Sequence, residues 1–199
     1  MLEDDVLVRY RKVLKLGRDG NDYYVPSNED VLSCYTALKE NEDLELIFLI
    51  LATSGIRFVE CLDFLKTFDV NKFKINDGFV SYSVANNRKT KNINTVFLPL
   101  FVYEKLKRIT GSNNRLQDVY NKKATFNAKY LRKWQYNFLL YNGVPEGVAD
   151  FIQGRASNSI GANHYLAKNQ QAEFWYKQVA KKLSEVLLLK EKTASNSIS

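Results

Sequence analysis

The spacing of apolar residues predicts a series of helices in the first third of the chain. A capping-box pattern at Ser27 and Asp30 predicts a helix over 28–40. The next segment, 43–54, is apolar on nearly every face, which predicts a helix buried on most sides. It ends before Gly55, which can supply the positive φ that a helix C-terminus favours.

The pattern then changes from helical spacing to a period of two, which is typical of strands. A further amphipathic helix, 56–65, precedes this change. Alternation over 72–84 and an apolar run at 96–100 predict a small antiparallel sheet. The basic segment between them, 85–94, is expected at the tip of its last hairpin, either as a solvated turn or as a contact to phosphates.

Helical spacing returns after the sheet and continues almost to the end of the chain. The expected helices are 100–109, 124–141, 145–153 and 172–190, with a loop at 111–114. The last of them is amphipathic, so its apolar face must dock on another surface. The predicted fold class is therefore mostly α with a small antiparallel β-sheet (α+β).

The 199 residues fit one compact domain with short additions at both ends. We expect this domain over 26–190, with 172–190 as its C-terminal docking helix. Residues 1–25 show no long periodicity and are interpreted as a linker or the remnant of a missing N-terminal domain. The Ser/Asn-rich end, 191–199, is expected to be a disordered tail.

Composition excludes several classes of protein. No apolar run approaches the roughly 18 residues of a membrane span, and the N-terminus lacks the basic flank of a signal peptide. We therefore expect a cytoplasmic protein of the host cell with no membrane partner. Only two cysteines, Cys34 and Cys61, and one histidine, His164, are present, which argues against disulfides and against a metal site.

Positive charge is concentrated in one block of the chain. Residues 1–70 carry 8 basic and 14 acidic side chains, whereas 86–133 carry 12 basic and 2 acidic ones. Such a block is the expected footprint of a polyanion. A solvated lysine-rich surface has the same charge pattern, so the choice depends on the chemistry of particular residues.

Tyr165 is the candidate nucleophile. A phenol has an ordinary pKa of about 10, so it attacks phosphorus only where cations stabilise the developing negative charge. Candidate cations are Arg57, the hairpin residues Arg88, Lys89 and Lys91, then Lys129, Arg132 and Lys133 on one predicted helix, and Arg155. A surface pair between Arg57 and Glu60 is the simpler interpretation of Arg57 taken alone.

These segments, in this order, resemble the catalytic domain of tyrosine recombinases, the phage-lambda-integrase family, over about residues 26–190. The resemblance lies in Thr53-Ser-Gly-Ile-Arg57-Phe-Val-Glu60, Tyr130-Leu-Arg132, Asn142-Gly-Val144, and Phe151-Ile-Gln-Gly154 followed by Tyr165. They look like the family's Thr-Gly-Leu-Arg-x-x-Glu box, its His-x-x-Arg helix ending in Gly-Val, and its Leu-Leu-Gly-His…Tyr segment. Lys129 and Arg155 stand where the family normally has histidine, which resembles the divergent integrases of archaeal fuselloviruses and plasmids.

The resemblance implies a recombinase that integrates a viral or other mobile element by cutting and rejoining DNA through a 3′-phosphotyrosine on Tyr165. Its catalytic residues would be Tyr165, Arg57, Arg132, Lys129, Arg155 and Lys89 as general acid, with Lys91 as the second choice. The DNA-binding residues would be Arg88, Lys91 and Lys133. No cofactor or metal is implied, because the covalent intermediate conserves the energy of the phosphodiester bond.

The expected partners are double-stranded DNA attachment sites and three further copies of the chain, in a homo-tetramer formed through the C-terminal helix. Two other functions remain open: a type IB topoisomerase that relaxes supercoils with the same chemistry, and a non-catalytic DNA-binding protein that retains the fold. Tyr176 and Tyr141 are the reserve candidates for the nucleophile.

Overall fold

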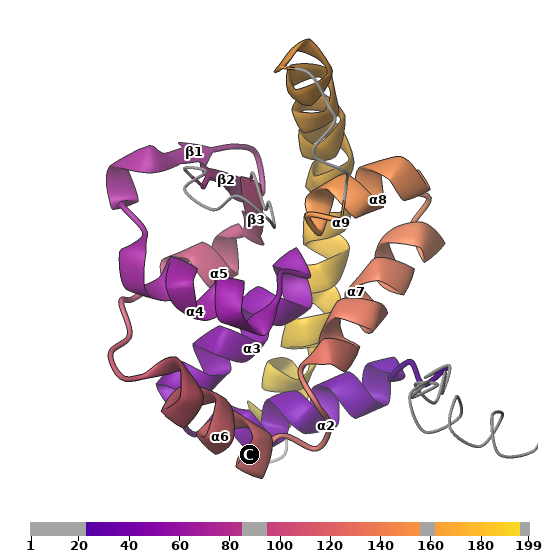
Figure 1. Ribbon diagram of the computed structural model, residues 1–199. Helices are drawn as coiled ribbons and strands as arrows, with labels where there is room; N and C mark the ends of the chain where they lie inside the picture. The colour runs from indigo at the N-terminus through magenta and orange to yellow at the C-terminus, as the bar shows by residue number, and fades with distance from the viewer. Residues whose placement is uncertain (1–22, 85–94, 156–161, 196–199) are drawn as a thin grey trace, which may run out of the picture.

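The computed structural model describes residues 23–84, 95–155 and 162–195, with the side chains of the last stretch described from Leu166 to Leu188 (Figure 1). The helices are α2 (Asn28–Leu38), α3 (Glu42–Ser54), α4 (Phe58–Thr67), α5 (Leu100–Glu104), α6 (Asn113–Lys123), α7 (Lys129–Tyr141), α8 (Glu146–Ile152) and α9 (Ala162–Ser195). The strands are β1 (Phe73–Ile75), β2 (Phe79–Ser83) and β3 (Thr95–Pro99), and a short 3-10 turn, η1 (Val70–Lys72), precedes them. The predicted α+β class is confirmed.

The first two helices lie close to the predicted ranges 28–40 and 43–54. The Ser27 side chain accepts from the N–H of Asp30, and the Asp30 carboxylate accepts from the N–H of Ser27, so the capping box is present. α3 lies at the centre of the molecule with all its residues from Leu46 to Ser54 buried (Figure 1). It ends at Gly55, whose φ of 66° is the left-handed conformation predicted for this helix end.

The sheet forms as predicted, with three antiparallel strands in the order β1-β2-β3. Phe73 pairs with Tyr82, and Ser83 pairs with Thr95. The proposed hairpin tip, 85–94, with Arg88, Lys89 and Lys91, lies outside the described residues.

The region after the sheet differs from the prediction. α6 was not predicted, because its sequence is polar and only Tyr120 in it is buried. Ser112 caps this helix by accepting from the N–H of Arg115. Ala124 adopts an extended conformation that ends α6, so α7 begins at Lys129 rather than at 124.

The prediction that the apolar face of 172–190 docks outside the chain was wrong. This stripe is buried against α8, β2 and β3 of the same chain because its residues recur every three or four positions. Its buried members are Ala172, Tyr176, Val179, Ala180, Leu183 and Leu187. α9 also runs on to Ser195 and thus includes part of the segment 191–199 that we expected to be disordered. No helix in the described ranges is both long and apolar enough to cross a membrane.

Candidate functional site

The turn between α3 and α4 presents Arg57. The residue adopts an extended conformation just before α4, and its N–H donates to Glu60 Oε2 at 2.8 Å. Its guanidinium pairs with Glu60 Oε1 at 2.7 Å, and 37% of the side chain remains exposed. The predicted surface pair between Arg57 and Glu60 is therefore present. The pair holds the Arg57 side chain in a position that a ligand can reach.

Arg132 approaches the same turn from α7. Its Nη1 donates to the carbonyl oxygen of Gly55 at 2.7 Å. Burial and then the positive charges of Arg57 and Arg155 together lower the pKa of Arg132 to about 10, whereas Glu60 and Asp150 act in the opposite direction. The structure thus brings together three of the predicted cations, Arg57, Arg132 and Arg155.

Two buried glutamines form hydrogen bonds to the backbone around Arg132. Gln153 Nε2 donates to the carbonyl oxygen of Arg132 at 2.8 Å and also to Gln135 Oε1. Gln135 Nε2 in turn donates to the carbonyl oxygen of Thr53 at 3.3 Å. A Cβ atom at Gly55 would collide with both glutamine side chains, so the position needs glycine for space as well as for its φ.

The sequence prediction missed Gln135 and Gln153. A signal for Gln135 was present, because it lies on the same helical stripe as the buried Leu131 and Leu139. A glutamine in such a stripe must be hydrogen-bonded, because an unpaired buried amide is costly. Its partner, Gln153, follows the last residue of α8 and is not identifiable from spacing.

The backbone at Arg155 is set by the end of α8. Gly154 has a φ of 65°, and its N–H donates to the carbonyl oxygen of Phe151 at 3.0 Å. The N–H of Arg155 donates to the carbonyl oxygen of Asp150 at 2.7 Å. These two bonds form a Schellman motif, so the Arg155 side chain leaves the backbone from a defined position.

Lys129 and Lys133 share α7 with Arg132 but contact a different part of the structure. Their Nζ atoms lie 4.7 Å and 5.2 Å from the ring centroid of Tyr130, so both lysines contact one aromatic ring. Lys133 also donates to the carbonyl oxygen of Tyr24 at 3.3 Å. Two of the α7 cations, Lys129 and Lys133, therefore contact the ring of Tyr130, whereas Arg132 contacts the turn at Gly55.

Tyr165 lies near the start of α9, and its side chain is outside the described residues. The N-terminal end of α9 projects beyond the neighbouring elements (Figure 1). The reserve candidate Tyr176 is wrong, because its ring is fully buried and its hydroxyl donates to the carbonyl oxygen of Thr53 at 3.0 Å. Tyr141, the other reserve, is 90% exposed at the end of α7.

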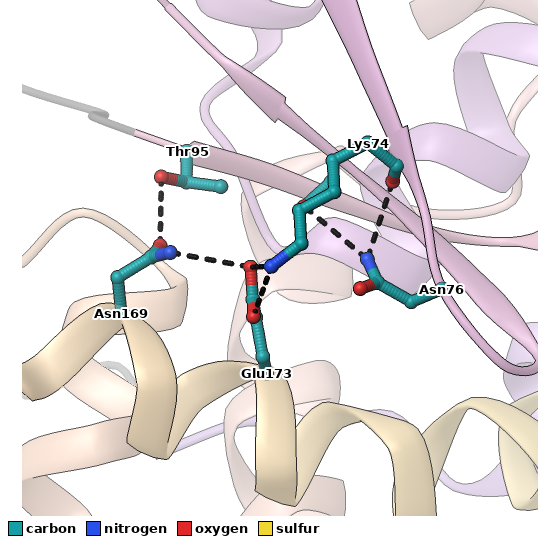
Figure 2. A network of polar contacts seen from close by, with 6 residues as sticks. Lys74, Asn76, Thr95, Asn169 and Glu173 are labelled. Carbon is teal, nitrogen blue, oxygen red and sulfur yellow. Dashed lines mark hydrogen bonds and ion pairs between the residues drawn. The ribbon is translucent and has the colours of Figure 1, made fainter. Parts of the chain in front are cut away.

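Polar contacts attach this part of α9 to the sheet (Figure 2). Lys74 Nζ on β1 donates to both carboxylate oxygens of Glu173, at 2.9 and 2.7 Å. Thr95 on β3 donates to Asn169 Oδ1 at 3.1 Å, and Asn169 Nδ2 donates to Glu173 at 3.3 Å. Because Asn169 lies one helical turn after Tyr165, these contacts restrain the helix that carries the candidate nucleophile.

The fold and this site together define an α+β protein whose three clustered arginines are suited to a phosphate group. A family model described as archaeal phage integrase matches residues 23–182, and the chain belongs to that family. The predicted resemblance to integrases is confirmed, and membership assigns the chain to DNA integration and recombination. No curated protein sequence matches the chain.

Proposed function

We propose that this integrase is a tyrosine recombinase that cuts and rejoins DNA at specific sites through a 3′-phosphotyrosine on Tyr165. The observation that carries the proposal is the proximity of Arg57, Arg132 and Arg155, which stand in the order and spacing of the recombinase boxes. The positive charges of Arg57 and Arg155 act on Arg132, so the negative charge of a ligand is favoured beside them. A DNA phosphate supplies that charge.

In the proposed step, the Tyr165 oxygen forms a bond to phosphorus and the bond from phosphorus to the 5′ oxygen breaks. The phenolic proton passes to a base, and Lys89, or Lys91 as the second choice, donates a proton to the departing 5′ oxygen. The products are a 3′-phosphotyrosine and a free 5′ hydroxyl. Reversal with a second 5′ hydroxyl rejoins the strands without a cofactor.

The arginines stabilise the transition state of this step. Their planar guanidinium groups donate pairs of hydrogen bonds to the non-bridging oxygens, where negative charge increases during the attack. Arg132 keeps one N–H on the Gly55 carbonyl, which orients the rest of its guanidinium. Lys129 adds positive charge beside Lys133, and these two lysines with Arg88 and Lys91 contact the DNA backbone.

We propose that residues 26–190 make up the catalytic domain and that four copies assemble on paired attachment sites. The apolar stripe of α9 is buried within its own chain, so contacts between copies would use other surfaces.

A nicked suicide substrate tests the proposal, because loss of the short 5′ fragment traps the covalent complex. The wild type should form an adduct, Tyr165→Phe should bind the DNA with no adduct, and the exposed control Tyr141→Phe should form the adduct normally. An adduct with Tyr165→Phe would refute the assignment. Relaxation of plasmid without strand exchange between attachment sites would favour a topoisomerase instead.

A further inference from the structure

Arg155 contacts an aromatic ring that has no role in the function proposed above. Its Cζ atom lies 4.4 Å from the ring centroid of Tyr136, a distance at which a guanidinium is attracted to the face of the ring. Tyr136 lies four residues after Arg132 on α7, so the two side chains occupy the same face of the helix one turn apart. The ring is therefore adjacent to the arginine cluster.

The ring of Tyr136 is itself held from the side of α8. Its hydroxyl donates to Glu146 Oε1 over 3.5 Å. Burial raises the pKa of Tyr136, as do the charges of Asp150 and Glu146, whereas Arg155 acts in the opposite direction. The side chain thus remains a neutral phenol that offers its face to Arg155.

An exposed arginine beside two others is repelled by their positive charges, which favours movement of its side chain into water. Arg57 and Arg155 both lower the pKa of Arg132, because the positive charge of each acts on it. Two features oppose this movement of Arg155: the Schellman motif, which fixes its backbone, and the ring of Tyr136, which attracts its guanidinium.

We infer that Tyr136 is a positioning residue that holds Arg155 beside Arg132 before DNA binds. The third arginine is then already in place when the phosphate arrives, and no ordering of its side chain is needed at that moment. The role of Arg155 toward phosphate rests on the proposed function, whereas its stacking on Tyr136 does not.

The stacking is tested in the DNA-free protein by NMR of the Arg155 side chain. The ring current of Tyr136 should move the Arg155 Hδ protons to higher field in the wild type and in Tyr136→Phe, which keeps the ring. Tyr136→Leu should abolish the shift, and Tyr136→Met is a second variant if the leucine protein does not fold. An unshifted Arg155 resonance in the wild type would overturn the inference.

The consequence for cleavage is tested by the rate of adduct formation on the suicide substrate in a single turnover. Tyr136→Leu should slow this rate about 2- to 5-fold, the worth of an exposed cation–π contact, and Tyr136→Phe should keep it. In an Arg155→Ala background, Tyr136→Leu should cause no further loss. An equal loss in both backgrounds would contradict positioning through Arg155.

These two measurements separate the inference from the proposed function. A wild-type protein that shows the ring-current shift but forms no adduct would contradict the recombinase mechanism and still support the stacking. A protein that forms the adduct without the shift would support the mechanism and contradict the inference.

Discussion

Arg132 donates a hydrogen bond to the carbonyl oxygen of Gly55 across 2.7 Å, and this bond joins α7 to the turn that presents Arg57. The left-handed conformation of Gly55 and the two glutamines packed against it set the position of that carbonyl. The relative positions of Arg57 and Arg132 therefore depend on the absence of a side chain at Gly55.

Substitution of Gly55 by alanine should destabilise the protein by about 3 kcal/mol, since the left-handed strain of about 1 kcal/mol adds to a collision with Gln135 and Gln153. Gly78→Ala is the matched control, because its φ is 85° and a Cβ there meets nothing within 4 Å. It should cost only about 1 kcal/mol. Denaturant unfolding measures both free energies, and equal losses would contradict the packing described at Gly55.

The guanidinium of Arg132 should titrate with a pKa of about 10 in the DNA-free protein. Since this pKa lies below the ordinary arginine value, the charged form opposes folding at neutral pH. That opposition is fully present below about pH 10, and it decreases as the pH rises from about 10 toward the ordinary arginine pKa, because only the unfolded chain then still binds the proton. Carbon-13 NMR of the Arg132 Cζ measures the midpoint.

Two variants should move this midpoint in opposite directions. Arg57→Gln removes a positive charge and should raise it, whereas Glu60→Gln removes a negative charge and should lower it. A midpoint that neither change moves would mean that these charges do not act on Arg132.

Sulfate should stabilise the protein by binding the arginine cluster. At about ten times its dissociation constant it should raise the melting temperature by roughly 3–5 °C above a chloride control of equal ionic strength. Arg57→Gln should lose this increment. Arg108→Gln should keep it, because Arg108 binds the carbonyls of Lys66 and Phe68 at the opposite end of α4, about 15 Å away.

A sulfate response that is the same in both variants would be the general effect of this salt on protein stability. It would argue against an anion site at Arg57.

The ion pair between Lys74 and Glu173 should contribute measurably to stability, because only 17% of the Glu173 side chain is exposed. A double-mutant cycle should give a coupling free energy of about 1 kcal/mol. The pair between Asp77 and Lys177, at 83% and 55% exposure, is the control and should give a smaller coupling free energy, because solvent screens it. Similar values for the two pairs would contradict a restraint on α9 at Glu173.

Local signals predicted much of the fold. Ser27, Gly55 and the alternation in β1 and β2 act through neighbours a few residues away, so the pattern sufficed to predict them. α6 was missed because only one of its residues is buried, which leaves no apolar stripe to detect. The surface that covers the apolar face of α9 was predicted wrongly, because periodicity predicts an apolar face but does not identify the surface that packs against it.

For the site, sequence order identified the cations but not their contacts. Arg57 and Arg132 are 75 positions apart, and only the packing of α3 on α7 brings them together. The partner of Gln135 and the ring under Arg155 follow from the packing of α7 on α8 and from the Schellman turn at Gly154. Such contacts depend on side-chain directions that spacing along the chain does not determine.

The covalent intermediate is the central claim, and peptide mapping of the trapped complex tests it most directly. The wild-type protein would be trapped on the suicide DNA, digested, and the nucleotide-bearing peptide identified by mass spectrometry. We predict a single modified residue, Tyr165. A nucleotide on Tyr141 or any other residue, or no covalent peptide at all from protein that binds the DNA, would contradict the account.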